Sequence, residues 1–213
     1  MSAPSTSVLD PRTLRRTVLV VALLNLAYFV VEAGVAVSIG SVSLLADSVD
    51  FLEDTAVNLL IALALGWSLA RRATAGKIMA GVILLPALAA AWGLFVKAGD
   101  PVPPDVTALV LTAGGAAVVN GICALLLLRV RHHGGSMTTA AFMVARNDVL
   151  VNVAIIAMAF VTLWTDSGWP DIVLGALIIL LNLDAAKEVW EVATEEGLAA
   201  KALAGEDVDP CSC

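Results

Sequence analysis

Apolar residues occupy this chain in six long blocks, and short turns with polar, glycine or proline residues separate them. Each block is close in length to the roughly 20 residues that an α-helix needs to cross a hydrocarbon core of about 30 Å. The pattern therefore predicts an all-α, polytopic membrane protein with six transmembrane helices. The blocks cover residues 17–39, 42–70, 77–96, 105–129, 137–164 and 170–190.

The composition agrees with this prediction. Of the 213 residues, 60% are hydrophobic and 15% are charged, which is too apolar for a soluble domain. The apolar run after the first basic cluster lacks a small-residue cleavage site, so we expect no cleaved signal peptide. The net charge of -7 comes partly from acids inside apolar blocks. We therefore expect a lipid bilayer around the chain and no nucleic-acid partner.

Basic residues indicate the orientation. Ten of the twelve Lys and Arg residues lie at the ends or in connections that share one side of the membrane. Because basic residues favour the cytoplasmic side, both termini are predicted to be cytoplasmic, in a multi-pass protein of the cell membrane. We divide the chain into a cytoplasmic segment 1–14, a six-helix transmembrane domain 15–194 and a short acidic cytoplasmic tail 195–213. In that tail we expect a fraying helix end followed by disordered chain.

The second block is unusual because it carries four acids within eight positions, Asp47, Asp50, Glu53 and Asp54. A charge at mid-bilayer costs about 2.5–3.5 kcal/mol on insertion scales, so acids at this depth indicate a functional site. At about 100° per residue, Asp47, Asp50, Asp54 and Asn58 fall on one stripe, with Glu53 at its edge. One face of this helix is therefore predicted to be a polar seam.

The fifth block places another acid at a similar depth. Asp54 lies 12 residues after Val42, and Asp148 lies 12 residues after Ser136 in a block that runs the opposite way. Twelve residues of helix rise about 18 Å, so both carboxylates are expected near the membrane midplane. Asn152 lies one turn beyond Asp148.

The first block adds two polar residues, Asn25 and Glu32, which are seven positions apart and share a helix face. These groups could line a common cavity with the acids of the second and fifth blocks. Glu32 is consistent with a proton site, with a partner for Arg146 in the fifth block and with a buried structural group. The sequence does not separate these roles.

The spacing of Asp50 and Asp54, at i and i+4, lets both carboxylates close on one cation, and Asp148 from a facing helix would complete a three-oxygen site. Such a site suits a divalent cation. Protons would compete with the metal for the same carboxylates, which supplies a mechanism for exchange. The structural alternative is a polar seam between packed helices. Asp47 is as consistent with a helix cap as with a ligand, and Glu53 fits helix packing better than coordination.

The segment NLAYFVVEAGVAVSIGSVSLLADSVDFLED resembles the first two helices of the cation diffusion facilitators. The resemblance covers most of residues 15–195 and includes TAAFMVARNDVLVN in the fifth block and WPDIVLGALIILLNLDAAKEVW in the sixth. It implies six helices with cytoplasmic termini and export of a metal ion. It also implies that Asp50, Asp54 and Asp148 are metal ligands, since they match the family's ligand positions.

Two departures from the family pattern bear on the substrate. Val144 occupies the position where the family usually has a second-site His or Asp, which leaves three of four expected ligands. Asn147 and Asn152 are candidate stand-ins, although Asn147 is not on the face of Asp148. The family's usual cytoplasmic metal-binding domain is absent after the sixth block, so we expect a short member that dimerises through its membrane helices.

The expected cargo is a divalent metal, and no prosthetic group or enzymatic activity is predicted. The family favours Zn²⁺, whereas an all-oxygen site favours Mn²⁺ or Fe²⁺, and Co²⁺ and Cd²⁺ are further candidates. Because a ligand is missing at Val144, the alternative function is that of a non-transporting regulatory or scaffolding membrane protein. An intramembrane aspartyl protease using Asp54 and Asp148 is disfavoured because the expected GxGD-type sequence is missing. The His132–His133 pair and the terminal Cys211 and Cys213 are weaker metal-binding signals.

Overall fold

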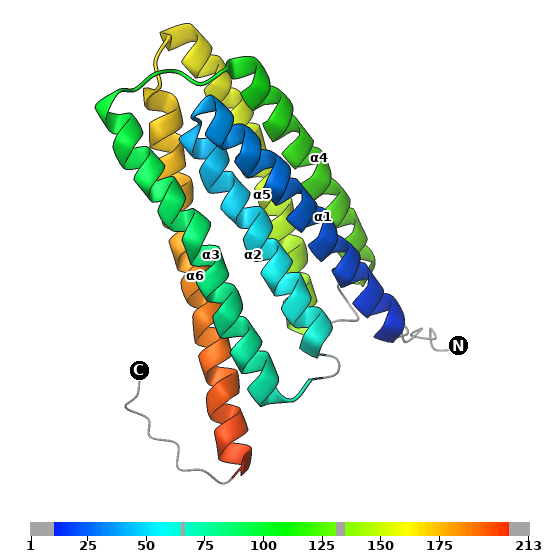
Figure 1. The fold of residues 1–213 in the computed structure, drawn as a ribbon. Helices are drawn as coiled ribbons and strands as arrows, with labels where there is room; N and C mark the ends of the chain where they lie inside the picture. Colours follow the sequence, from blue (N-terminus) through cyan, green and yellow to red (C-terminus); the bar gives the residue numbers. More distant parts are fainter. Residues whose placement is uncertain (1–10, 65–66, 131–134, 205–213) are drawn as a thin grey trace, which may run out of the picture.

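The computed structural model describes residues 11–64, 67–130 and 135–204, and these residues form six α-helices (Figure 1). Successive helices alternate in direction, so the start of the first and the end of the last lie at the same end of the bundle (Figure 1). The all-α, polytopic prediction is confirmed. The helices are α1 (Pro11–Ile39), α2 (Val42–Ala64), α3 (Leu69–Gly99), α4 (Val106–Val130), α5 (Gly135–Thr165) and α6 (Trp169–Ala204).

Several helix ends differ from the apolar blocks. The second helix ends at Ala64 and the third begins at Leu69, so Arg71, Arg72 and Lys77 lie on α3 and not in a connection. The sixth helix continues to Ala204, well beyond the predicted end of its block. An apolar block ends where charged residues begin. Arg, Lys, Glu and Ala are all strong helix formers, so the helices continue beyond the apolar region.

Four helices among the described residues are long and apolar enough to cross a membrane by themselves. They contain the spans Arg12–Ile39, Ala73–Gly99, Val106–Val130 and Ala141–Thr165. The second helix carries the four acids, and the apolar part of the sixth, Trp169–Leu183, is shorter. Because α2 packs against α1, α3, α5 and α6, its acids can face protein instead of lipid.

The helices form two groups (Figure 1). In one group α1 packs on α2 and α4, and α4 packs on α5; in the other, α3 and α6 lie side by side along much of their length. Large apolar side chains are exposed around the outside of the bundle, as a surface in contact with lipid requires. Examples are Leu23, Val30, Trp92, Phe95, Leu111, Trp164 and Leu180.

The end of the bundle that the basic residues assign to the outer side is held together by the carboxylate of Asp171, at the start of α6. This side chain is fully buried. It accepts hydrogen bonds from the backbone N–H groups of Val42 and Ser43 at 2.8 and 3.2 Å, and from the Ser41 hydroxyl at 2.7 Å. An acid near the first N–H groups of α2 satisfies donors that have no partner inside the helix. Asp171 therefore joins α6 to the α1–α2 turn.

Candidate metal site

The polar seam predicted for α2 is present and faces the interior. Asp47, Asp54 and Asn58 are 1%, 4% and 0% exposed, whereas Asp50 and Glu53 are half-buried. The buried positions recur at helical spacing because one stripe of α2 lies against its neighbours in the bundle. Three of the four residues of the stripe inferred from sequence are therefore buried, and the fourth, Asp50, is half-buried.

Asp54 is oriented by the first helix. The side-chain amide of Asn25 donates to Oδ2 of Asp54 at 3.1 Å, and both residues are buried. The thiol of Cys123, on α4, donates to Oδ1 of Asn25 at 3.4 Å. With the amide oxygen occupied by the thiol, the NH₂ group of Asn25 is directed to the carboxylate. Three helices thus determine the position of one acid.

Cys123 was not among the candidate residues identified from the sequence. In the sequence it is a single cysteine inside an apolar run, and a buried cysteine usually behaves as a small hydrophobic residue. Its contact with Asn25 joins positions 98 residues apart. One sequence feature could have indicated this contact. Asn25 is an amide in an apolar helix, so both its NH₂ group and its oxygen would need hydrogen-bond partners.

Asp148 approaches the acids of α2 from α5. Its side chain is 7% exposed, and its Oδ2 atom accepts no hydrogen bond. Asp50 and Asp54 are close enough to interact electrostatically with it. The side-chain NH₂ group of Asn152 donates to the Asp148 backbone carbonyl at 3.0 Å. The Asn152 Oδ1 atom is buried and accepts no hydrogen bond. The structure thus gathers the three expected ligands into one region between α2 and α5.

These carboxylates do not converge on a single point. Within the described ranges, no three His, Cys, Asp or Glu side chains form a group that could hold a metal ion. One oxygen of Asp54 is also engaged by Asn25. Coordination by Asp50, Asp54 and Asp148 together therefore stays a prediction, and it requires that side chains or helices move.

A second pair of acids lies beside this region. Glu32 of α1 and Asp47 of α2 are 0% and 1% exposed, and their carboxyl groups are direct neighbours. Asn152 lies beside Asp47. None of the four carboxylate oxygens accepts a hydrogen bond of good geometry. Because buried oxygens without donors are costly, such a pair requires a proton or a cation to be stable.

Comparison with known proteins identifies the family. A family model described as the cation efflux transmembrane domain matches residues 18–194. This chain belongs to the cation efflux family. The match covers most of the chain and includes every acid described above, so the resemblance inferred from the sequence is confirmed. No curated protein matches the chain.

As a member of the cation efflux family, the protein is a multi-pass membrane protein of a family that transports metal cations. The position where we expect a departure from the family pattern, Val144, lies on the exposed face of α5. Val144 is 42% exposed, and both Arg146 and Asn147 are exposed. The Arg146 guanidinium lies 3.5 Å from Oδ1 of Asn147. The structure therefore does not bring Asn147 to the acids, whereas it does bring Asn152. The His132–His133 pair, Cys211 and Cys213 lie outside the described residues.

Proposed function

We propose that this cation efflux protein exports a divalent metal ion from the cytoplasm through Asp50, Asp54 and Asp148, in exchange for protons. One observation carries the proposal: the buried Asp148 carboxylate has an oxygen that accepts no hydrogen bond, and it lies close enough to Asp54 of α2 to interact with it electrostatically. Three carboxylates carry three negative charges, which a divalent cation would largely neutralise. The same groups are stabilised by protons when the metal leaves, so metal and protons would alternate.

The donor set bears on the choice of metal. Carboxylate and amide oxygens suit Mn²⁺ and Fe²⁺, whereas Zn²⁺ favours histidine or cysteine among its ligands. The six helices as described contain no histidine, and His132 and His133 lie outside the described residues. We propose Mn²⁺ or Fe²⁺ from the site chemistry, with Zn²⁺, Co²⁺ and Cd²⁺ as the alternatives that the experiment must include.

We also propose that the protein acts as a homodimer through its membrane helices. This proposal is supported by the many large apolar side chains on the outside of the bundle, which offer surface for helix packing. Crosslinking in native membranes, with the mass of the product measured by gel electrophoresis, would test it. A product of monomer mass at all crosslinker concentrations would contradict it.

Metal-dependent proton flux in proteoliposomes tests the transport proposal across the five metals. Asp54→Asn and Asp148→Asn remove a charge and keep the side-chain shape, and each should abolish flux. Asp166→Asn is the matched control, because Asp166 is exposed outside the bundle and Asn tolerates its positive φ of 49°. Flux that survives in both site variants would exclude this site as the transport path.

A second function is favoured by Val144. If the missing ligand prevents transport, the chain would bind metal without moving it and would serve as a regulatory or scaffolding membrane protein. Equilibrium metal binding measured on the same liposomes separates the two functions. Binding that Asp148→Asn abolishes, together with an absence of flux in the wild type, would establish the second function.

A further inference from the structure

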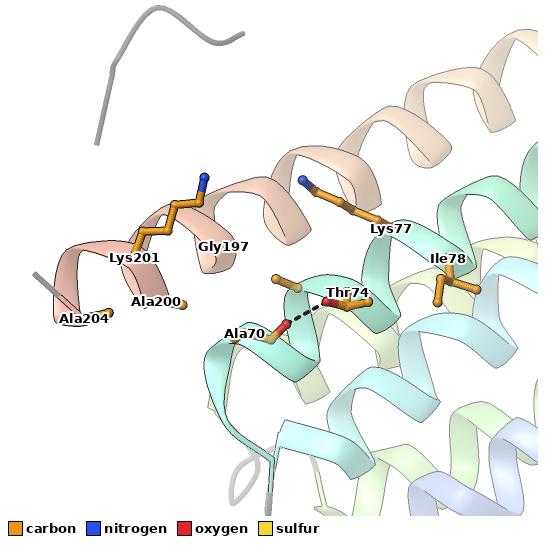
Figure 2. Close-up of a pocket in the computed structure, with 9 residues that line it drawn as sticks. Ala70, Thr74, Lys77, Ile78, Gly197, Ala200, Lys201 and Ala204 are labelled. Atoms are coloured by element: carbon orange, nitrogen blue, oxygen red, sulfur yellow. Dashed lines mark hydrogen bonds between the residues drawn. The ribbon is translucent and has the colours of Figure 1, made fainter. Parts of the chain in front are cut away.

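A groove of about 530 Å³ lies between α3 and α6, at the end of the bundle assigned to the cytoplasm (Figure 2). Small residues line much of it, Ala70 and Ala73 from α3 and Gly197 and Ala200 from α6. The helices approach closely here, since a Cβ atom on Gly197 would lie 3.6 Å from Cβ of Ala73. The groove is separate from the acids of α2 and α5.

Two lysines line this groove, Lys77 from α3 and Lys201 from α6. Figure 2 shows their side chains leaning toward each other, with both ammonium groups on the same side of the groove. No acidic side chain lines the groove among the described residues. By contrast, Lys187 on α6 pairs with Glu191 at 3.6 Å and does not line it. The described side chains that line the groove are therefore positively charged or uncharged.

The depth of the groove follows from the length of α6. Its 36 residues rise about 54 Å, which exceeds a hydrocarbon core of about 30 Å. Counting about 20 residues from Trp169, the helix leaves the core close to Trp190. The Lys77 ammonium lies 5.5 Å from the centre of the Trp190 ring. Tryptophan and lysine at this position are typical of the boundary between lipid and water, so the Lys77 end of the groove lies at the level of the lipid headgroups and the rest extends toward the cytoplasm.

We propose that this groove binds the headgroup of an anionic phospholipid from the cytoplasmic leaflet, with its phosphate between Lys77 and Lys201. The small residues allow the glycerol backbone to lie close to the helices. Basic pockets between membrane helices on the cytoplasmic side attract anionic headgroups. A second copy of the chain is a poorer occupant, because the described linings of two such grooves would bring four lysines together. The proposal does not depend on the transport site.

The test uses the full chain in neutral detergent, titrated with phosphatidylglycerol or phosphatidylcholine, while native mass spectrometry counts the bound lipids. Wild type should bind phosphatidylglycerol more tightly than phosphatidylcholine. Each lysine contributes about fivefold to the binding of an anionic lipid, so Lys77→Gln with Lys201→Gln should weaken phosphatidylglycerol binding about 25-fold. Lys187→Gln is the matched control, being an exposed lysine of the same helix outside the groove, and it should bind as wild type.

Three outcomes would overturn the proposal. The first is equal affinity of wild type for the two lipids. The second is unchanged phosphatidylglycerol binding in the double variant, or an equal loss in Lys187→Gln. The third is displacement of the lipid by millimolar inorganic phosphate, which would make this a site for soluble anions. Circular dichroism of each variant distinguishes a loss of binding from a loss of fold. These exposed substitutions should leave the helical signal unchanged.

Discussion

The ammonium of Lys97 lies 2.8 Å from Oδ2 of Asp171, and the side chains of both residues are largely buried. Lys97 lies in the last turn of α3 and Asp171 in the first turn of α6, so this ion pair joins the outer ends of those two helices. The same lysine donates to the Gly40 carbonyl in the α1–α2 turn. Gly40 has a φ of 66°, which glycine adopts without strain. One buried pair therefore links α3 and α6 to the α1–α2 turn.

Breaking this pair should destabilise the protein strongly. Removing one partner leaves a buried charge without compensation, which costs roughly 3–5 kcal/mol. We expect Lys97→Met and Asp171→Asn each to lower the unfolding temperature in detergent. Lys187→Met is the control, because its pair with Glu191 is exposed. If Lys97→Met unfolds at the wild-type temperature, the pair does not hold the outer end together.

Asn25 should act as a positioning residue for the metal site. Its amide holds Asp54 at 3.1 Å, so Asn25→Ala should let that carboxylate rotate away. Loss of such an orienting contact typically weakens metal affinity about 10- to 100-fold. Titration of Mn²⁺ by calorimetry measures the change. Asn147→Ala, on the exposed side of α5, should bind as wild type, and a loss as large as that of Asn25→Ala would contradict the positioning role.

Metal affinity should fall as the pH is lowered. Metal binding requires the deprotonated carboxylates, so protons compete with the metal and binding releases protons. Calorimetry in buffers of different ionisation enthalpy would count the protons released by each metal. Asp148→Asn should reduce that count, because it removes one exchanging group. An affinity for metal that does not change with pH would exclude competition at these acids.

Gly115 should resist enlargement because of Tyr28. A Cβ atom at Gly115 would overlap the Tyr28 hydroxyl, which donates to the Thr112 carbonyl at 2.7 Å. Overpacking of this kind typically costs about 1–3 kcal/mol, so Gly115→Ala should lower the unfolding temperature. Gly114→Ala is the control, since a Cβ atom there meets nothing within 4 Å. Adding Tyr28→Phe to Gly115→Ala should recover part of the loss, and the absence of any recovery would contradict this contact.

Much of the fold and part of the site followed from local pattern. Apolar runs of the length of a membrane span determined six helices, and the period of an α-helix placed Asp47, Asp54 and Asn58 on one face. The depth of Asp54 and Asp148 in the membrane was counted from the helix ends in the same way, and it stays a prediction. The physical reason is that the cost of exposing polar groups to lipid acts on each helix separately.

Tertiary structure decided what those helices present to one another. The contact of Cys123 with Asn25 joins positions 98 residues apart, and that of Lys97 with Asp171 joins positions 74 apart. The groove at Lys77 and Lys201 depends on α6 continuing beyond its apolar block. Sequence periodicity shows which face of a helix is buried, whereas helix packing determines which partner that face meets. The chain alone thus established a membrane bundle with buried acids, and its folding brought Asp148 to the acids of α2.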